Sequence, residues 1–126
     1  MANFIVAGQF TQGNQCGSGP GLAVHEGRLY CVHAGARDPS LWWCVFDPTT
    51  NTWSQDRQFT NGNEVGGDAA LAIVNGVLYC AHSGNNDGYL WFCTFDSRSQ
   101  TWSEDARLGR DNRGSFGVGL LVNPFA

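Results

Sequence analysis

A repeat of 49 residues runs through nearly the whole chain and constrains its fold more than any single motif. Residues of the first half return 49 positions later without a gap: Phe10-Thr11 as Phe59-Thr60, Tyr30-Cys31 as Tyr79-Cys80, Leu41-Trp42 as Leu90-Trp91, and Thr52-Trp53-Ser54 as Thr101-Trp102-Ser103. A period of about 40 to 50 residues is typical of proteins that build one four-stranded sheet again and again. The sequence therefore predicts repeated small β-sheets.

The repeat also continues past both ends of its two complete copies. Phe4 stands 49 positions before Trp53, and Leu120 stands 49 positions after Leu71. A chain of this length is expected to form one domain. We expect that domain over 1–126, with complete repeat units at 10–58 and 59–107 and partial units at 1–9 and 108–126, or about two and a half units in all.

Each complete copy reads as four short strands separated by polar turns. The expected strands are 21–24, 29–33, 41–46 and a segment around Trp53, then 70–74, 78–82, 90–95 and a segment around Trp102. Asn75-Gly76, between two apolar runs, is a strong signal for a tight hairpin. The second and third strands of each copy are apolar at both alternating sets of positions, which predicts sheets packed on both faces.

Charge and hydropathy exclude several classes of function. The 126 residues carry a formal net charge of -4, and the arginines are scattered, so we expect no basic patch for nucleic acid. No segment approaches the roughly 20 apolar residues of a membrane span. The first eight residues have neither the basic region nor the apolar core of a secretory signal. These features predict a cytoplasmic protein or one that is secreted by a non-classical route.

Four of the five cysteines follow the repeat: Cys31 with Cys80 and Cys44 with Cys93, whereas Cys16 does not. Without a secretory signal, buried free thiols are the first expectation. A cross-strand disulfide between Cys31 and Cys44 is the alternative, and it depends on a register that the sequence does not give. No Cys-x-x-Cys occurs, so we expect no zinc site, and no motif indicates another metal or a cofactor.

The order of these elements resembles a kelch-type propeller blade. The second copy has an Asn-Gly hairpin, a strand ending near Gly84, and then Phe95-Asp96 followed by Thr101-Trp102-Ser103. The chain departs from the kelch pattern at the glycine doublet, where it has Ala34-Gly35 and Ser83-Gly84. It is also similar to lectin-like and sialidase-like propeller repeats that carry Leu-Trp-Trp and Thr-Trp-Ser-x-Asp segments.

This resemblance implies an all-β protein, a β-propeller built from four-stranded blades of 49 residues. A propeller closes with about four to eight blades, so about two and a half blades cannot close a ring. We therefore expect a homo-oligomer with cyclic symmetry to complete the ring. Two chains and three chains are both compatible with the sequence.

The turn between the second and third strands of each copy has the composition of a carbohydrate site. Carboxylate, amide and guanidinium groups hydrogen-bond sugar hydroxyls, and an aromatic ring covers the apolar face of a pyranose. The candidate residues are His33, Arg37, Asp38, Trp42, His82, Asn86, Asp87, Tyr89 and Trp91. Structural roles compete with this reading, because the aspartates could cap their turns, the tryptophans could pack between blades and the histidines could end strands.

Sites that recur in equivalent form favour binding over catalysis. No nucleophile elbow and no phosphate-binding glycine loop occurs, and the arginines that a sialidase would need do not follow the repeat. We therefore expect no enzyme activity and no catalytic residues. The sequence favours a lectin with several glycan sites, whose avidity would raise affinity. The alternative is a kelch-like module that binds another protein through its loops.

Overall fold

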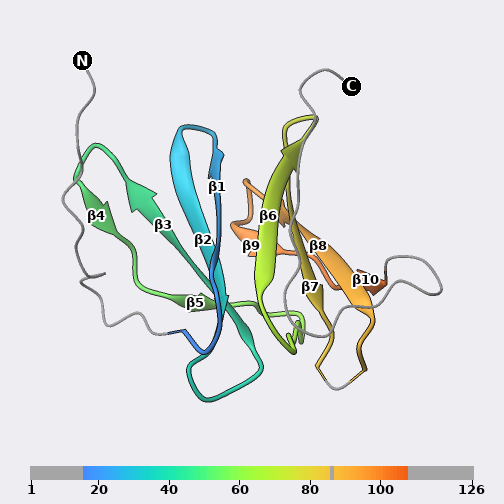
Figure 1. The fold of residues 1–126 in the computed structure, drawn as a ribbon. Helices are drawn as coiled ribbons and strands as arrows, with labels where there is room; N and C mark the ends of the chain where they lie inside the picture. The colour runs from blue at the N-terminus through green and yellow to red at the C-terminus, as the bar shows by residue number, and fades with distance from the viewer. Residues whose placement is uncertain (1–15, 86, 108–126) are drawn as a thin grey trace.

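The computed structural model describes residues 16–85 and 87–107, which form two antiparallel sheets of five strands each (Figure 1). No helix occurs within those two ranges, so the predicted all-β class is confirmed. The first repeat unit supplies one sheet, and the second unit supplies the other. The predicted partial units 1–9 and 108–126 lie outside the described residues.

The first sheet keeps its long strands in chain order, with β4 and β5 both paired to β3. Its strands are β1 (Gly21–His25), β2 (Arg28–Ala34), β3 (Leu41–Asp47), β4 (Thr52–Trp53) and β5 (Arg57–Gln58). The three long strands match the prediction. The expected fourth strand is split in two, because the Val45 amide donates to the side-chain Oγ of Ser54 at 3.0 Å.

The second sheet repeats this topology one unit later. Its order is β10-β8-β7-β6, with β9 also paired to β8. Its strands are β6 (Ala69–Val74), β7 (Val77–Ser83), β8 (Leu90–Asp96), β9 (Thr101–Trp102) and β10 (Ala106–Arg107). The first two strands of both sheets pair in the same register, so equivalent residues of the two copies lie on equivalent faces.

Both first hairpins close through two-residue turns with positive φ at each position. The φ angles are 51° at Glu26 and 75° at Gly27, and 50° at Asn75 and 78° at Gly76. This geometry matches the right-handed twist of the flanking strands and suits Asn-Gly. The predicted hairpin at Asn75-Gly76 is confirmed, and Glu26 adopts the same left-handed conformation although a glutamate favours it less.

Each sheet has two faces, and the repeat makes each face of the first sheet equivalent to one face of the second. In the first sheet Leu22 pairs across from a cysteine, and the next residue along β1 pairs with Tyr30 on the opposite face. Leu71 and Tyr79 take the same two places in the second sheet. We call the face that carries Leu22 or Leu71 the Leu face, and the face that carries Tyr30 or Tyr79 the Tyr face.

The core forms where the Tyr face of the first sheet packs on the Leu face of the second. The ring of Phe95 lies 5.4 Å from that of Tyr30 and 5.1 Å from that of Trp43, between centroids. Trp102 is 1% exposed, and it stacks on Phe59 with centroids 4.7 Å apart. Aromatic contacts of this kind add to the free energy of burial.

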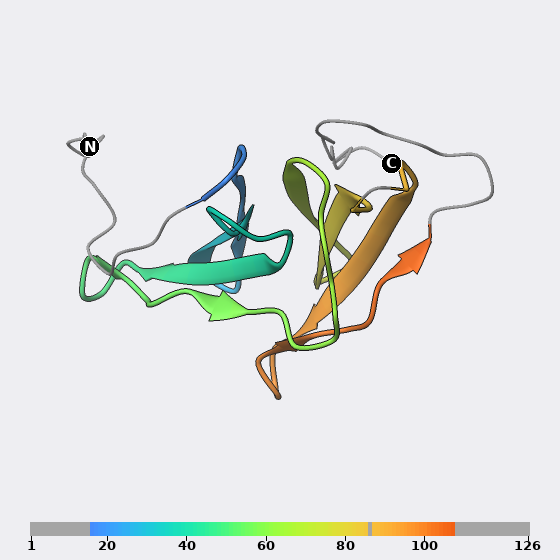
Figure 2. The same cartoon turned by 90° about the horizontal axis from the view of Figure 1, so that it is seen from below.

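Strands β1 and β6 lie side by side at this junction (Figures 1 and 2). A β-carbon on Gly21 would stand 2.6 Å from the carbonyl oxygen of Ala69, so this close approach requires glycine. Just before these strands, the Gly19 amide donates to Asp68 Oδ1 at 2.6 Å. Residues one repeat apart therefore meet here, as expected when each repeat packs on the next in the same way.

Candidate functional site

Asp38 and Asp87 organise equivalent turns, each between the second and third strands of its sheet. Asp87 Oδ1 accepts a hydrogen bond from the Tyr89 amide at 2.9 Å, and Oδ2 accepts one from the Trp91 indole N–H at 3.3 Å. The carboxylate of Asp38 accepts the same two kinds of bond one repeat earlier, at 2.9 and 3.3 Å. Each aspartate thus caps its turn and also orients a half-buried tryptophan.

A glycine lies directly against each of these carboxylates. A β-carbon on Gly35 would stand 2.5 Å from Asp38 Oδ1, and one on Gly84 would meet both Asp87 and the indole nitrogen of Trp91. The glycine that the chain retains in its kelch-like doublet therefore leaves room for the carboxylate. A larger residue would displace the aspartate and, with it, the tryptophan.

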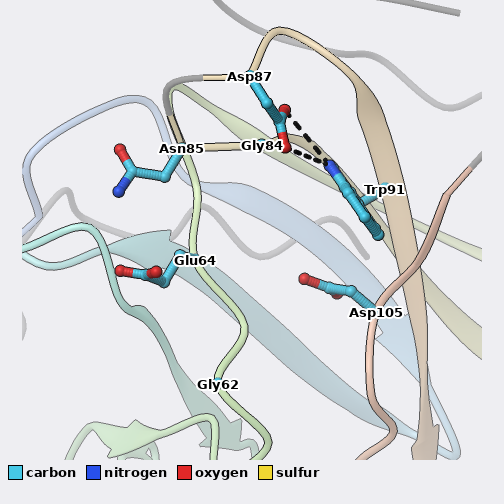
Figure 3. A pocket seen from close by; sticks show the side chains of 7 residues that line it. All are labelled: Gly62, Glu64, Gly84, Asn85, Asp87, Trp91 and Asp105. Atoms are coloured by element: carbon cyan, nitrogen blue, oxygen red, sulfur yellow. Dashed lines mark hydrogen bonds between the residues drawn. The ribbon is translucent and has the colours of Figure 1, made fainter.

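A cleft of about 230 Å³ lies beside the turn of the second sheet (Figure 3). Its lining comes from the linker between the sheets, the turn after β7, the start of β8 and the segment after β9: Gly62, Glu64, Gly84, Asn85, Asp87, Trp91 and Asp105. Figure 3 shows the Asp87 carboxylate pointing at the indole nitrogen of Trp91. The cleft therefore combines one aromatic ring with three carboxylates and one amide.

The linker between β5 and β6 forms one wall of the cleft because it is bonded to both sheets. Asn63 is 2% exposed, and its Nδ2 donates to Asp105 Oδ1 at 2.8 Å in the second sheet. On the other side, the Val65 amide donates to the carbonyl of Pro39 at 2.8 Å. These bonds place Glu64, which lies between the two anchored residues, in the lining.

The two candidate histidines are buried at strand ends and do not line this cleft. His33 is 3% exposed and His82 is 0% exposed, and Nε2 of each lies 3.0 Å from an aspartate Oδ1, in Asp56 and Asp105 respectively. Burial lowers the pKa of His33, but hydrogen bonds to Asp56 and to the Ala34 carbonyl outweigh it, so that pKa is raised above its ordinary value. The histidines therefore position aspartates, and one of those aspartates lines the cleft.

Two of the candidates from the second copy come together in the cleft. Asp87 and Trp91 line it, whereas the ring of Tyr89 packs against the Arg107 guanidinium, whose carbon lies 4.7 Å from the ring centroid. Asn86 lies outside the described residues. The predicted pairing of a carboxylate with an aromatic ring therefore occurs in the turn itself.

In the first copy, Asp38 and Trp42 form the same bonded pair, and Arg37 is exposed. The sequence left open whether Trp42 and Trp91 pack between the sheets. Both are half-buried, whereas Trp43 and Trp102 belong to the core of the junction and are 2% and 1% exposed. Because side chains alternate along a strand, adjacent tryptophans must lie on opposite faces.

The sequence prediction did not include Glu64, Asn85 or Asp105 in the site. A signal was present for Asp105, which repeats Asp56, and for Asn63 beside Glu64, which repeats Asn14. Repetition marks these residues as structurally important. It does not show that they share one cleft, because that depends on the path of the linker.

The repeated cysteines form two directly opposed cross-strand pairs. Cys31 lies opposite Cys44, and Cys80 lies opposite Cys93; all four are buried free thiols, as expected. A hydrogen bond to the opposite thiol, together with burial, raises the pKa of Cys44 and of Cys93. Within the described ranges, no cluster of three or more His, Cys, Asp or Glu side chains suits a metal ion.

No protein-family model matches this chain, and no curated protein is significantly similar to it. Over residues 16–85 and 87–107, the structure contains no helix with the length and apolar character needed to cross a bilayer. The function must therefore be inferred from the geometry and chemistry of the cleft.

Proposed function

We propose that this protein is a lectin that binds carbohydrate in the cleft beside Trp91. The observation that carries the proposal is a half-buried tryptophan, oriented by Asp87, in a cleft that Glu64, Asn85 and Asp105 also line. The ring would cover the apolar face of a pyranose, and the carboxylate and amide groups would bond its hydroxyls. The volume of about 230 Å³ suits one sugar residue, since pockets for drug-sized ligands measure roughly 300 to 1,000 Å³.

The charge of the cleft narrows the class of sugar. Three carboxylates line it, and the described lining contains neither lysine nor arginine. Carboxylates repel other anions, and the repulsion is stronger at a partly buried site than in bulk water. Neutral sugars and amino sugars therefore fit this cleft better than sialic acids or uronic acids.

We further propose that the two sheets are neighbouring blades of a propeller whose ring other copies of the chain complete. Two features support this: β1 and β6 lie side by side, and residues one repeat apart bond to each other at the junction. A ring with cyclic symmetry would carry one such cleft per copy or more. Simultaneous binding to several glycans of one surface would then raise the affinity.

Glycan-array binding, followed by calorimetric titration of the best ligand, tests the proposal. We expect the double variant Glu64→Ala/Asn85→Ala to bind at least about tenfold more weakly, or about 1.4 kcal/mol, with an unchanged thermal midpoint. Glu104→Ala is the matched control, because Glu104 is exposed and lies outside the cleft lining. Full affinity in the double variant, or an equal loss in the control, would contradict the assigned site.

A folded protein that binds no glycan on the array would contradict the lectin proposal as a whole. That outcome would favour the alternative of a kelch-like module that binds another protein. The exposed turns would then be tested by capture of protein partners, with Arg37→Ala as the first variant because this side chain is exposed.

A further inference from the structure

We infer that the Leu face of the first sheet binds the Tyr face of the second sheet of another copy, head to tail. The inference rests on the ring assembly proposed above and names the two surfaces that meet. The junction inside the chain is the template, since there the Tyr face of the first sheet packs on the Leu face of the second. The Leu face of the first sheet and the Tyr face of the second lie outside this junction, and we call them the outer faces. They are the same two kinds of surface that meet inside the chain, shifted by one repeat, so each is suited to the other.

The Leu face of the first sheet exposes apolar side chains that are covered in the second sheet. Leu22 is 53% exposed and Val24 is 66% exposed, whereas Leu71 is only 7% exposed. Ile73, the equivalent of Val24, packs against the core. These residues have the same register in both sheets, so the difference lies in the neighbour that covers them.

The Tyr face of the second sheet shows the converse contrast. Val74 is 44% exposed, whereas His25 at the same position of the first sheet is 5% exposed. Tyr79 is half-buried, whereas its equivalent Tyr30 is 3% exposed. Exposed apolar surface of this kind marks an interaction site when it is contiguous with a packed face.

The aromatic cluster of the internal junction has a counterpart divided between the two outer faces. Inside the chain, Phe95 from the Leu face contacts Tyr30 and Trp43 from the Tyr face, whose own rings lie 6.1 Å apart. On the outer Tyr face, the rings of Tyr79 and Phe92 form an equivalent pair, with centroids 6.2 Å apart. Phe46, the residue equivalent to Phe95, stands on the outer Leu face.

A paired change of residue type also fits contact between the outer faces. At the internal junction, the Ser97 hydroxyl lies 3.5 Å from Nε2 of His25. The equivalent residues on the outer faces are Pro48 and Val74, so both members of a polar pair are apolar there. An apolar pair is favourable when the two side chains bury each other and has no such benefit when both stay in water.

Blocking each face separately tests the inference. Leu22→Glu/Val24→Glu places two charges on the outer Leu face, and Ala72→Glu/Val74→Glu places two on the outer Tyr face. We expect the wild type to be an oligomer by light scattering and each variant alone to have the 13.7 kDa mass of one chain. An equimolar mixture of the two variants should form a dimer of twice that mass, because each retains the face that the other has lost.

The repeat also supplies a matched control. Thr50→Glu/Gln55→Glu adds the same charge to the first sheet at positions whose equivalents, Ser99 and Glu104, stay exposed beside the internal junction. This control should assemble like the wild type. Circular dichroism checks that all variants fold, and Leu22→Ser/Val24→Ser repeats the test if glutamates prevent folding.

Each contrary result has a distinct meaning. A monomeric wild type would overturn both the ring and this inference. Three results would overturn the head-to-tail pairing alone. They are retained assembly of the Leu22→Glu/Val24→Glu variant, self-association of the Ala72→Glu/Val74→Glu variant, and a mixture of the two that stays monomeric. Glycan titration of the monomeric variants reports on the cleft separately, so failure of assembly is distinguishable from failure of the lectin proposal.

Discussion

The two sheets share a sequence pattern and a topology, yet equivalent residues have different environments. Trp102 is 1% exposed and stacks on Phe59, whereas Trp53 is half-buried. Leu71 belongs to the core, whereas Leu22 is exposed. The contribution of a residue in a repeat protein is therefore set by the neighbouring repeat as much as by its own sheet.

The largest expected difference between the sheets concerns the repeated tryptophan. Trp102→Ala should lower the free energy of unfolding by about 3–5 kcal/mol, because it removes a fully buried ring and leaves a cavity. Trp53→Ala should cost less, since Trp53 is only half-buried. Urea denaturation of both variants measures the difference, and equal losses would show that the two sheets are equally covered.

The repeated leucine should show a smaller difference of the same kind. Leu71→Ala should cost about 2–3 kcal/mol, at the lower end for buried leucines, because Leu71 is 7% exposed. Leu22→Ala should stay within about 0.5 kcal/mol in the dilute, unassembled chain, as is usual for surface substitutions. Thermal midpoints measured over a series of protein concentrations sharpen the comparison, because Leu22→Ala should become more costly as copies assemble.

Protonation of His33 should make stability depend on pH. The folded pKa of His33 is raised, chiefly by its bond to Asp56 against the opposing effect of burial. This stabilisation is therefore complete below the unfolded pKa of about 6.5 and is lost as the pH rises through the folded pKa. Urea denaturation across this pH range should show that the free energy of unfolding declines as the pH rises, and His33→Gln should make this decline smaller. If the decline has the same size in His33→Gln, other groups cause it. His82→Gln makes the same substitution at the equivalent position of the second sheet.

The smallest expected difference between the two sheets concerns the reactivity of their cysteines toward thiol reagents. Cys44 and Cys93 are buried, and the pKa of each is raised, so both should stay protonated and resist thiol reagents in the folded protein. Cys16 is exposed and should react. Cys31 and Cys80 are buried free thiols as well, so burial should protect them too, although the hydrogen bond with Cys44 lowers the pKa of Cys31. Thiol titration should therefore label one cysteine before denaturation and all five after it, and fewer than five would indicate a disulfide.

Much of the fold could be predicted because strand formation depends on local pattern. Short apolar runs bounded by turn residues predicted the six long strands. Asn75-Gly76 predicted its hairpin, since the turn geometry needs positive φ at both residues. The split of the expected strand around Trp53 could not be predicted in the same way. It depends on the side chain of Ser54 replacing a backbone group in the ladder.

The cleft was predictable only in the part that lies within one turn. Asp87 and Trp91 are four residues apart, and local turn chemistry brings them together. Glu64 and Asp105 come from segments far apart in the sequence, and they share the cleft because Asn63 bonds the linker to the second sheet. A pattern of residue types does not carry that information.

The sequence by itself determined the period and the all-β class, because these follow from the recurrence of short apolar runs separated by turn residues. Only the tertiary structure decided which tryptophan of the Trp42-Trp43 pair fills the junction and which copies of Leu22 and Leu71 are covered. The physical reason is that burial between sheets depends on where a neighbour packs. Two repeats of the same topology therefore differ where one has a neighbour and the other presents its face to solvent.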